Sequence, residues 1–132
     1  MSVDLSKYEI VGYIDENIAK LAGIKYIGNV YAAPGVIKHI KKRHKNELTK
    51  NILDNLLDTI KDIVKNPEYV GRGNKKVGTS IEFIKKVDKN ILVAADLDIK
   101  EGYLYIASLY PIKRAKIENR LNSGRIKQYK KK

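Results

Sequence analysis

Both histidines of the chain, His39 and His44, lie in one basic stretch from Pro34 to Glu47, together with Arg43 and four lysines. Imidazole groups gain and lose protons near neutral pH, while guanidinium and ammonium groups bind the negative charge of phosphate. The stretch therefore has the residue types that acid–base chemistry at a phosphodiester requires. We expect it to carry the function of the chain.

Cleavage of RNA without a metal uses such residues. One group removes the proton of the 2′-hydroxyl, another protonates the leaving 5′-oxygen, and cations stabilise the charge on the phosphorane. Ser108 and Tyr110 add hydroxyl groups at the end of an apolar run. Asp96 and Asp98 alternate to one face of a strand but lack a nearby glutamate pattern, which disfavours a two-metal nuclease. The glycines between residues 69 and 78 fit no nucleotide-binding fingerprint, and no cofactor is predicted.

The basic stretch has the pattern of an amphipathic helix that starts at Pro34. At about 100° per residue, one arc of this helix is apolar apart from a histidine (Val36, Ile37, Ile40 and His44). His39 and Arg43 flank the arc, and lysines take the far side (Lys38, Lys41, Lys42 and Lys45). His39 is better exposed, and a neighbouring cation favours the neutral imidazole that a general base needs. His44 fits a packed position as well as a catalytic one.

The surrounding elements predict a single α+β domain, residues 1–132, with helices packed on one face of a small antiparallel meander. The chain before Pro34 has the pattern of a strand, a short helix and an extended segment (8–14, 15–23 and 24–33). A long amphipathic helix runs from Leu48 to Asn66-Pro67. Three strand-like runs with short connections follow (79–87, 91–97 and 102–110). Residues 112–121 can form a basic helix, and residues 125–132 form a basic C-terminal tail.

Alternation in the last of these strands predicts where its hydroxyl groups lie. Leu104, Ile106, Ser108 and Tyr110 should share one face of the strand. If the helices cover Leu104 and Ile106, then Ser108 and Tyr110 continue that face to the edge of the core. Polar groups would then lie where the first helix ends.

The net charge of +12 is concentrated in two segments. Residues 34–47 hold five basic residues and one acidic residue, and residues 111–132 hold nine and one. This concentration favours a binding site for a polyanion over a uniformly solvated surface. We expect the last lysines to form a mobile electrostatic arm (Lys127, Lys130, Lys131 and Lys132). The alternative is a basic tail and a lysine-striped helix without specific function.

Composition excludes several classes of protein. The chain has no cysteine, so disulfides and thiolate metal sites are absent, and two histidines alone make a structural zinc site a poor interpretation. No run approaches about 18 apolar residues, and the first residues lack the pattern of an export signal. We expect a protein of the cytoplasm, of the producing or the target cell, without a membrane partner.

Several of these segments together resemble a known family. The helix Ile37–His44, the long helix ending in Asn66-Pro67-Glu68-Tyr69, the meander and the run Ser108-Leu109-Tyr110-Pro111 resemble the phage-associated nucleases of the barnase, EndoU, colicin and RelE superfamily. The resemblance extends from about Tyr8 to about Arg120. It implies a compact α+β fold, metal-independent ribonuclease activity, and use as a phage or bacterial toxin that cleaves tRNA or other structured RNA.

The resemblance also implies site residues. Its helical histidines correspond to His39 and His44, with either one as the acting residue, and its polar strand end corresponds to Ser108 and Tyr110. Phosphate contacts are expected from nearby cations (Lys42, Arg43, Lys113 and Arg114). An acidic immunity or antitoxin protein is the expected partner besides RNA. A non-catalytic basic nucleic-acid-binding protein remains the alternative, and a DNA-packaging or phage structural factor is a third interpretation that rests on charge.

Overall fold

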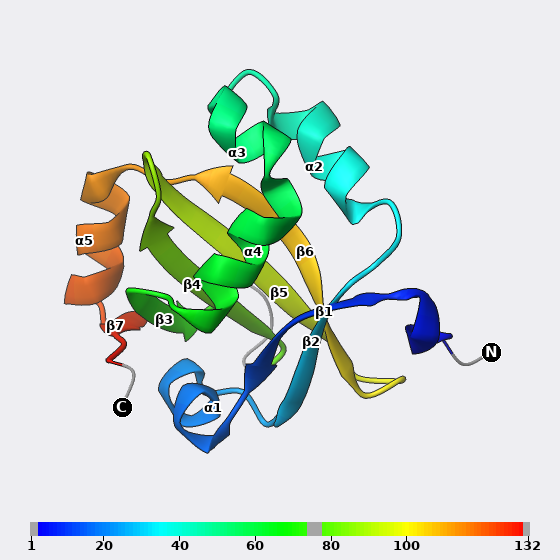
Figure 1. Ribbon diagram of the computed structural model, residues 1–132. Coiled ribbons are helices and arrows are strands. Elements are labelled where there is room, and N and C mark those ends of the chain that lie inside the picture. The colour runs from blue at the N-terminus through cyan, green and yellow to red at the C-terminus, as the bar shows by residue number, and fades with distance from the viewer. Residues whose placement is uncertain (1–2, 74–77, 131–132) are drawn as a thin grey trace.

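A twisted mixed β-sheet organises the chain (Figure 1). The computed structural model describes residues 3–73 and 78–130, and within them the sheet has seven strands in the order β1-β2-β6-β5-β4-β3-β7. Neighbouring strands are antiparallel except β2 and β6, which are parallel. The strands are β1 Glu9–Ile14, β2 Gly28–Ala32, β3 Tyr69–Arg72, β4 Ser80–Lys86, β5 Asn90–Asp98, β6 Tyr103–Pro111 and β7 Ile126–Gln128.

The predicted meander is present as β4, β5 and β6, but the sheet around it is larger than expected. A parallel neighbour, β2, lies beside β6, and β3 and β7 extend the sheet beyond β4. The β2–β6 and β3–β7 pairings join segments far apart in the chain, so they depend on tertiary packing rather than on local turn signals. The expectation of a small, purely antiparallel meander was therefore wrong in extent and in direction.

Helices cover parts of both faces of the sheet. They are the 3-10 helix η1 Leu5–Lys7, α1 Glu16–Ala22, α2 Val36–His44, α3 Lys50–Asp54, α4 Leu56–Lys65 and α5 Arg114–Asn122. Asp15 caps α1 by accepting from the backbone N–H of Ile18, and Gly23 ends it in a left-handed conformation at φ 66°. No helix in the described part of the chain is long and apolar enough to cross a membrane.

The long helix predicted from Leu48 is interrupted. Asn55, with φ −124° and ψ 36°, separates α3 from α4. Its side-chain amide donates to the carbonyl oxygen of Asn51 at 3.0 Å, and such local bonds compete with the helical ladder. The apolar spacing continues across the break, which explains why the sequence pattern did not reveal it.

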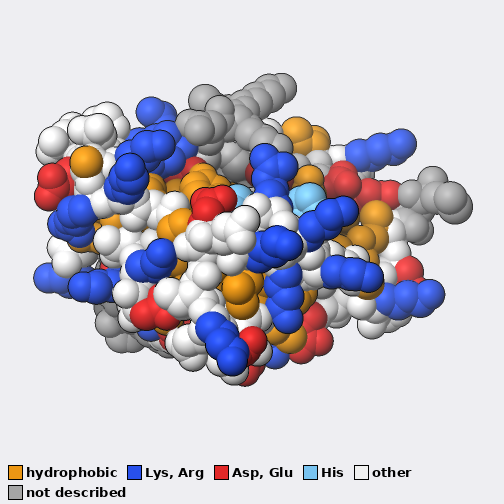
Figure 2. Space-filling model, turned by 90° about the horizontal axis from the view of Figure 1, so that it is seen from above, with side chains coloured by type: hydrophobic (Ala, Val, Ile, Leu, Met, Phe, Trp, Pro, Cys, Tyr) orange, Lys and Arg blue, Asp and Glu red, His pale blue; other side chains and the backbone are white. Residues whose placement is uncertain are grey.

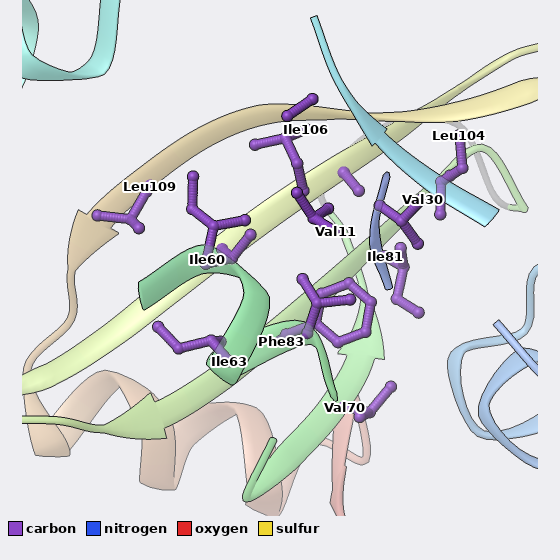
Figure 3. Close-up of a cluster of buried hydrophobic side chains, with 14 of the residues drawn as sticks. Val11, Val30, Ile60, Ile63, Val70, Ile81, Phe83, Leu104, Ile106 and Leu109 are labelled. Carbon is purple, nitrogen blue, oxygen red and sulfur yellow. The ribbon is translucent and has the colours of Figure 1, made fainter. Parts of the chain in front are cut away.

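The main hydrophobic core lies between α4 and one face of the sheet. Figure 3 shows Ile60 and Ile63 of α4 near Phe83, and all three side chains are fully buried. Residues that alternate with these core positions, such as Ile84 and Leu92, belong to a second, smaller cluster with Ile117 of α5 on the opposite face. The expectation that all helices pack on one face was therefore wrong, because α5 covers part of the other.

A β-bulge in β6 changes the predicted alternation. Ala94 pairs with Ser108 but Ala95 pairs with Ile106, so Ala107 is an extra residue in the strand. One extra residue moves every later side chain to the other face. Leu109 therefore enters the main core, while Ser108 and Tyr110 lie on the face of α5 rather than continuing that of Ile106.

Part of the C-terminal tail is built into the sheet. β7 pairs antiparallel with β3, and Ile126 is 1% exposed. The expectation of a mobile arm therefore fails at Lys127, which lies in this strand. Lys131 and Lys132, two of the lysines assigned to that arm, lie outside the described residues.

Candidate active site

The second half of β6 is flanked by helix α2. Among the described strands, β2 pairs with β6 only at Leu104 and Tyr105, so the rest of that edge has no strand partner. α2 contacts β6, and its Ile40 is fully buried in the main core. Burial of this residue holds the carboxyl end of the helix close to the end of the strand.

His44 and Tyr110 meet at this edge. Their ring centroids are 6.0 Å apart with an interplanar angle of 35°, and His44 is 9% exposed, as its place in the apolar arc predicted. Nδ1 of His44 lies 3.1 Å from Oε1 of Glu47. Its Nε2 is buried and has no hydrogen-bond partner among the described residues. The contact places a proton-carrying ring beside a phenol at the end of β6.

His39 and Arg43 lie on the exposed part of α2. Within residues 3–73 and 78–130, no hydrogen bond, ion pair or ring contact joins His39 to Ser108 or Tyr110. Lys42 lies on another side of the helix, where it lines a pocket of about 480 Å³ together with Lys38, Lys41 and Lys45. Seen from above, histidine side chains reach the surface among lysine and arginine side chains (Figure 2). The structure thus brings His44 and Tyr110 together but leaves His39 separate from them.

A basic pocket of about 530 Å³ adjoins the His44–Tyr110 contact. Glu47 and Pro111 are among its lining residues, and its cations come from two segments, the end of β4 with the β4–β5 connection and the start of α5 (Lys86, Lys89, Lys113 and Arg114). The guanidinium of Arg114 lies 5.9 Å from the centre of the Tyr69 ring, and its Nη1 donates to the Tyr69 hydroxyl at 3.3 Å. This hydrogen bond raises the pKa of Arg114. The predicted phosphate ligands Lys113 and Arg114 therefore lie in one pocket, apart from Lys42.

A buried carboxylate on β4 was not predicted from the sequence. Glu82 is 3% exposed. Arg120 Nε donates to its Oε1 at 3.3 Å, and Arg125 Nη2 donates to its Oε2 at 3.0 Å. Burial raises the pKa of Glu82, and the two arginines oppose this with a smaller effect. The pKa of Tyr110 is raised by burial and by the charge of Glu82. Electrostatic interaction therefore connects this cluster to the end of β6.

Glu82 and Ser108 lie on the same face of the sheet. Glu82 pairs with Ala94, and Ala94 pairs with Ser108, so the three side chains form a row across β4, β5 and β6. Two strand spacings separate the ends of the row, which is roughly 10 Å. Ala94 lies in a central strand but is partly exposed, so this part of the face is open. No local signal marks Glu82 as buried, because its partners follow 38 and 43 residues later.

Within the described residues, no group of three or more His, Cys, Asp or Glu side chains is placed to hold a metal ion.

Comparison with known families identifies the class of protein as a phage-associated nuclease. The model of the family described as phage-Barnase-EndoU-ColicinE5/D-RelE like nuclease3 matches residues 9–119, and the chain belongs to this family. No curated protein and no solved structure matches the chain. The match confirms the resemblance inferred from the sequence. It includes Glu82, Ser108 and Tyr110, and it ends just before Arg120.

Proposed function

We propose that the protein is a metal-independent endoribonuclease. The observation that supports this most directly is the contact between His44 and Tyr110 beside the basic pocket, with ring centroids 6.0 Å apart. The contact combines groups that can move a proton with cations that can bind phosphate. Membership of the nuclease family supports action on a nucleic acid.

The chemistry is an intramolecular transesterification. A general base takes the proton of the 2′-hydroxyl, a bond forms between the 2′-oxygen and phosphorus, and the bond from phosphorus to the 5′-oxygen breaks. The products are a 2′,3′-cyclic phosphate and a 5′-hydroxyl. A proton must also reach the 5′-oxygen as that bond breaks, and cations must stabilise the phosphorane. No redox step or bound cofactor is needed for this balance.

We assign these roles to residues on α2 and β6. His39 is the exposed imidazole and acts as general base, while the His44–Tyr110 pair supplies the proton to the leaving oxygen. Ser108, on the open face of the sheet, donates a hydrogen bond to the phosphate. The exposed cations bind the flanking phosphates (Lys42, Arg43, Lys113 and Arg114). Glu82 is a positioning residue, because its carboxylate is buried and holds two arginines.

Charge and family membership support the proposed substrate class. A net charge of +12 suits a long polyanion, and the family name includes colicin and RelE nucleases. We therefore propose that tRNA or another structured RNA is cleaved, and that the protein acts as a phage or bacterial toxin in the cytoplasm. An acidic immunity or antitoxin protein that covers the basic pocket would restrain it, with fast, salt-dependent association.

One observation favours a second function, that of a non-catalytic nucleic-acid-binding protein. Nε2 of His44 is buried, and no hydrogen bond, ion pair or ring contact joins His39 to Ser108 or Tyr110 among the described residues. The basic pocket alone would serve for binding phosphate.

Incubation of the purified protein with total RNA in EDTA separates the two functions. The endoribonuclease should cleave in the chelator and leave 2′,3′-cyclic phosphate or 3′-phosphate ends. Loss of cleavage in EDTA, with recovery on addition of Mg²⁺, would contradict the metal-independent mechanism. Absence of cleavage under both conditions, with RNA still bound, would establish the binding function.

A further inference from the structure

Four tyrosines lie together at the opposite end of β6 from Tyr110: Tyr8, Tyr31, Tyr103 and Tyr105. Tyr31 of β2 is the register partner of Tyr105. Tyr105 is also the register partner of Asp96 on β5. Asp96 lies on the same face of β5 as Ala94, and Ala94 is the register partner of Ser108. The tyrosines and Ser108 therefore lie on the same open face of the sheet.

The rings hold one another in fixed orientations. Tyr8, Tyr31 and Tyr103 form three edge-to-face pairs with centroids 6.0 to 6.5 Å apart and interplanar angles of 74° to 79°. Tyr105 packs on Tyr103 at 5.7 Å and 44°. Tyr103 is 8% exposed and supports the other three, which are only partly buried. Rings that are already ordered lose little entropy when a ligand binds.

Tyr103 is buried, but these tyrosines form a group separate from the two hydrophobic clusters. None of the four belongs to the main core or to the smaller cluster under α5. A set of rings that only filled the interior would be fully buried, yet three of them retain exposed surface. The cluster therefore presents aromatic surface to solvent on the face that carries Ser108.

Charge differs between the two ends of β6. The partners of Tyr105 and Tyr103 on β5 are Asp96 and Asp98, whereas the cations of the basic pocket lie at the Pro111 end. Asp96 is buried, but the partly exposed carboxylate of Asp98 repels phosphate at this end. The tyrosine end therefore suits bases, and the pocket end suits the phosphate backbone.

We propose that Tyr8, Tyr31 and Tyr105, supported by Tyr103, form a base-stacking platform that selects RNA with unpaired nucleotides. The proposal rests on the proposed function, because it takes RNA as the substrate. Only unstacked bases can lie against a protein ring, so loops and single strands would bind the platform, whereas regular duplexes would bind only through the cations. Tyr105 and Ser108 are three residues apart, roughly 10 Å along a strand. RNA held on the platform can therefore continue to the proposed cleavage site.

The test uses a short 2′-O-methyl RNA, which lacks the attacking hydroxyl, with 2-aminopurine at one position. The single strand should bind the wild-type protein more tightly than the same strand in a blunt duplex, and its fluorescence should be quenched by stacking. Tyr31→Leu and Tyr105→Leu should each weaken single-strand binding by about 5-fold or more and reduce the quenching, while leaving duplex binding unchanged. Tyr31→Phe and Tyr105→Phe keep the ring and are the matched controls.

Wild-type affinity and quenching in both leucine variants would overturn the proposal. If those variants do not fold, as judged by circular dichroism, the wild-type protein still tests the proposal. Equal binding of single strand and duplex by the wild-type protein, without quenching, would overturn the proposal. Cleavage is measured separately in EDTA, so a protein that stacks bases but does not cleave would contradict the nuclease mechanism and support the platform.

Discussion

Arg125 Nη2 donates to Oε2 of Glu82 at 3.0 Å, which ties the start of the C-terminal segment to the middle strands of the sheet. Arg120 of α5 bonds the other carboxylate oxygen at 3.3 Å. The pair of bonds joins β4 to the helix and to the residue before β7. The last part of the chain is therefore held by a buried ion cluster as well as by strand pairing.

Replacement of Glu82 should destabilise the fold strongly. Glu82→Ala leaves two arginines without their buried partner, and loss of one member of such a cluster costs about 3–5 kcal/mol. Glu118→Ala is the control, because its pair with Arg114 is exposed and screened by water. Urea unfolding should show a large loss of stability for the first variant and little change for the second. Equal effects would mean that the Glu82 cluster contributes no more than a surface pair.

Two truncations separate the packed and charged parts of the tail. Removal of residues 130–132 deletes three lysines beyond β7, so RNA affinity should fall while the melting temperature is unchanged. Removal of residues 125–132 also deletes β7 and Arg125, so the melting temperature should fall as well. Thermal unfolding and RNA binding at several salt concentrations should be measured for both truncated proteins. A longer truncation that melts like the wild type would contradict the role of β7.

Local patterns in the sequence predicted the elements that carry the candidate site. α2 was predictable because its apolar spacing follows Pro34, and Ile40 and His44 are indeed its buried residues. The three strands of the meander were predictable because short polar connections separate apolar runs. The observed bounds, 80–86, 90–98 and 103–111, differ from the predicted ones by one residue at each end.

Features that depend on distant residues were not predictable. The bulge at Ala107 has no local signal, and it moved Ser108 and Tyr110 to the opposite face. The local sequence around Glu82 has the pattern of a solvated strand residue. Its burial depends on Arg120 and Arg125, which follow much later in the chain and fold over it. The tyrosine cluster did have a signal, because the chain contains nine tyrosines but one phenylalanine and no tryptophan. Such a bias favours rings with a polar, partly exposed edge.

The two histidines should differ in their effects. His39→Ala should lower the rate of RNA cleavage by about 100-fold or more with little change in affinity, as expected for a general base. His44→Ala should lower both the rate and the stability, because this side chain is packed against Tyr110. Single-turnover cleavage and thermal unfolding provide the measurements, with Lys25→Ala as an exposed control. An unchanged rate for His39→Ala would move the assignment to His44.

The basic pocket should determine the salt dependence of binding. Lys113→Ala and Arg114→Ala together remove two cations from it, and each lost phosphate contact reduces the magnitude of the salt slope by roughly 0.7 for a single strand. Titration of RNA over a range of salt concentrations measures the slope. Lys25→Ala removes one charge outside the pocket and should change the slope much less. Equal slopes for the double variant and the wild type would exclude the pocket as a phosphate site.

Tyr103 should make the stability of the protein sensitive to alkaline pH. Burial, a hydrogen bond with Tyr8 and the nearby charge of Asp98 raise the pKa of Tyr103 from 10.0 to about 12. The folded protein therefore retains this proton at pH values where the unfolded chain has lost it. Folded molecules then bind more protons than unfolded ones, and the free energy of unfolding falls as pH rises from about 10 to about 12.

Tyr103→Phe removes this ionisation but keeps the ring. Its stability should fall less steeply than that of the wild type between about pH 10 and about pH 12, because the unfolded variant gains no charge at residue 103. Urea unfolding of both proteins across this range measures the difference, and below about pH 9 the two curves should run parallel. The comparison cancels the contributions of other tyrosines with raised pKa values, such as Tyr110. Curves that remain parallel up to pH 12 would show that Tyr103 ionises equally in both states, and that burial in the tyrosine cluster does not retain its proton.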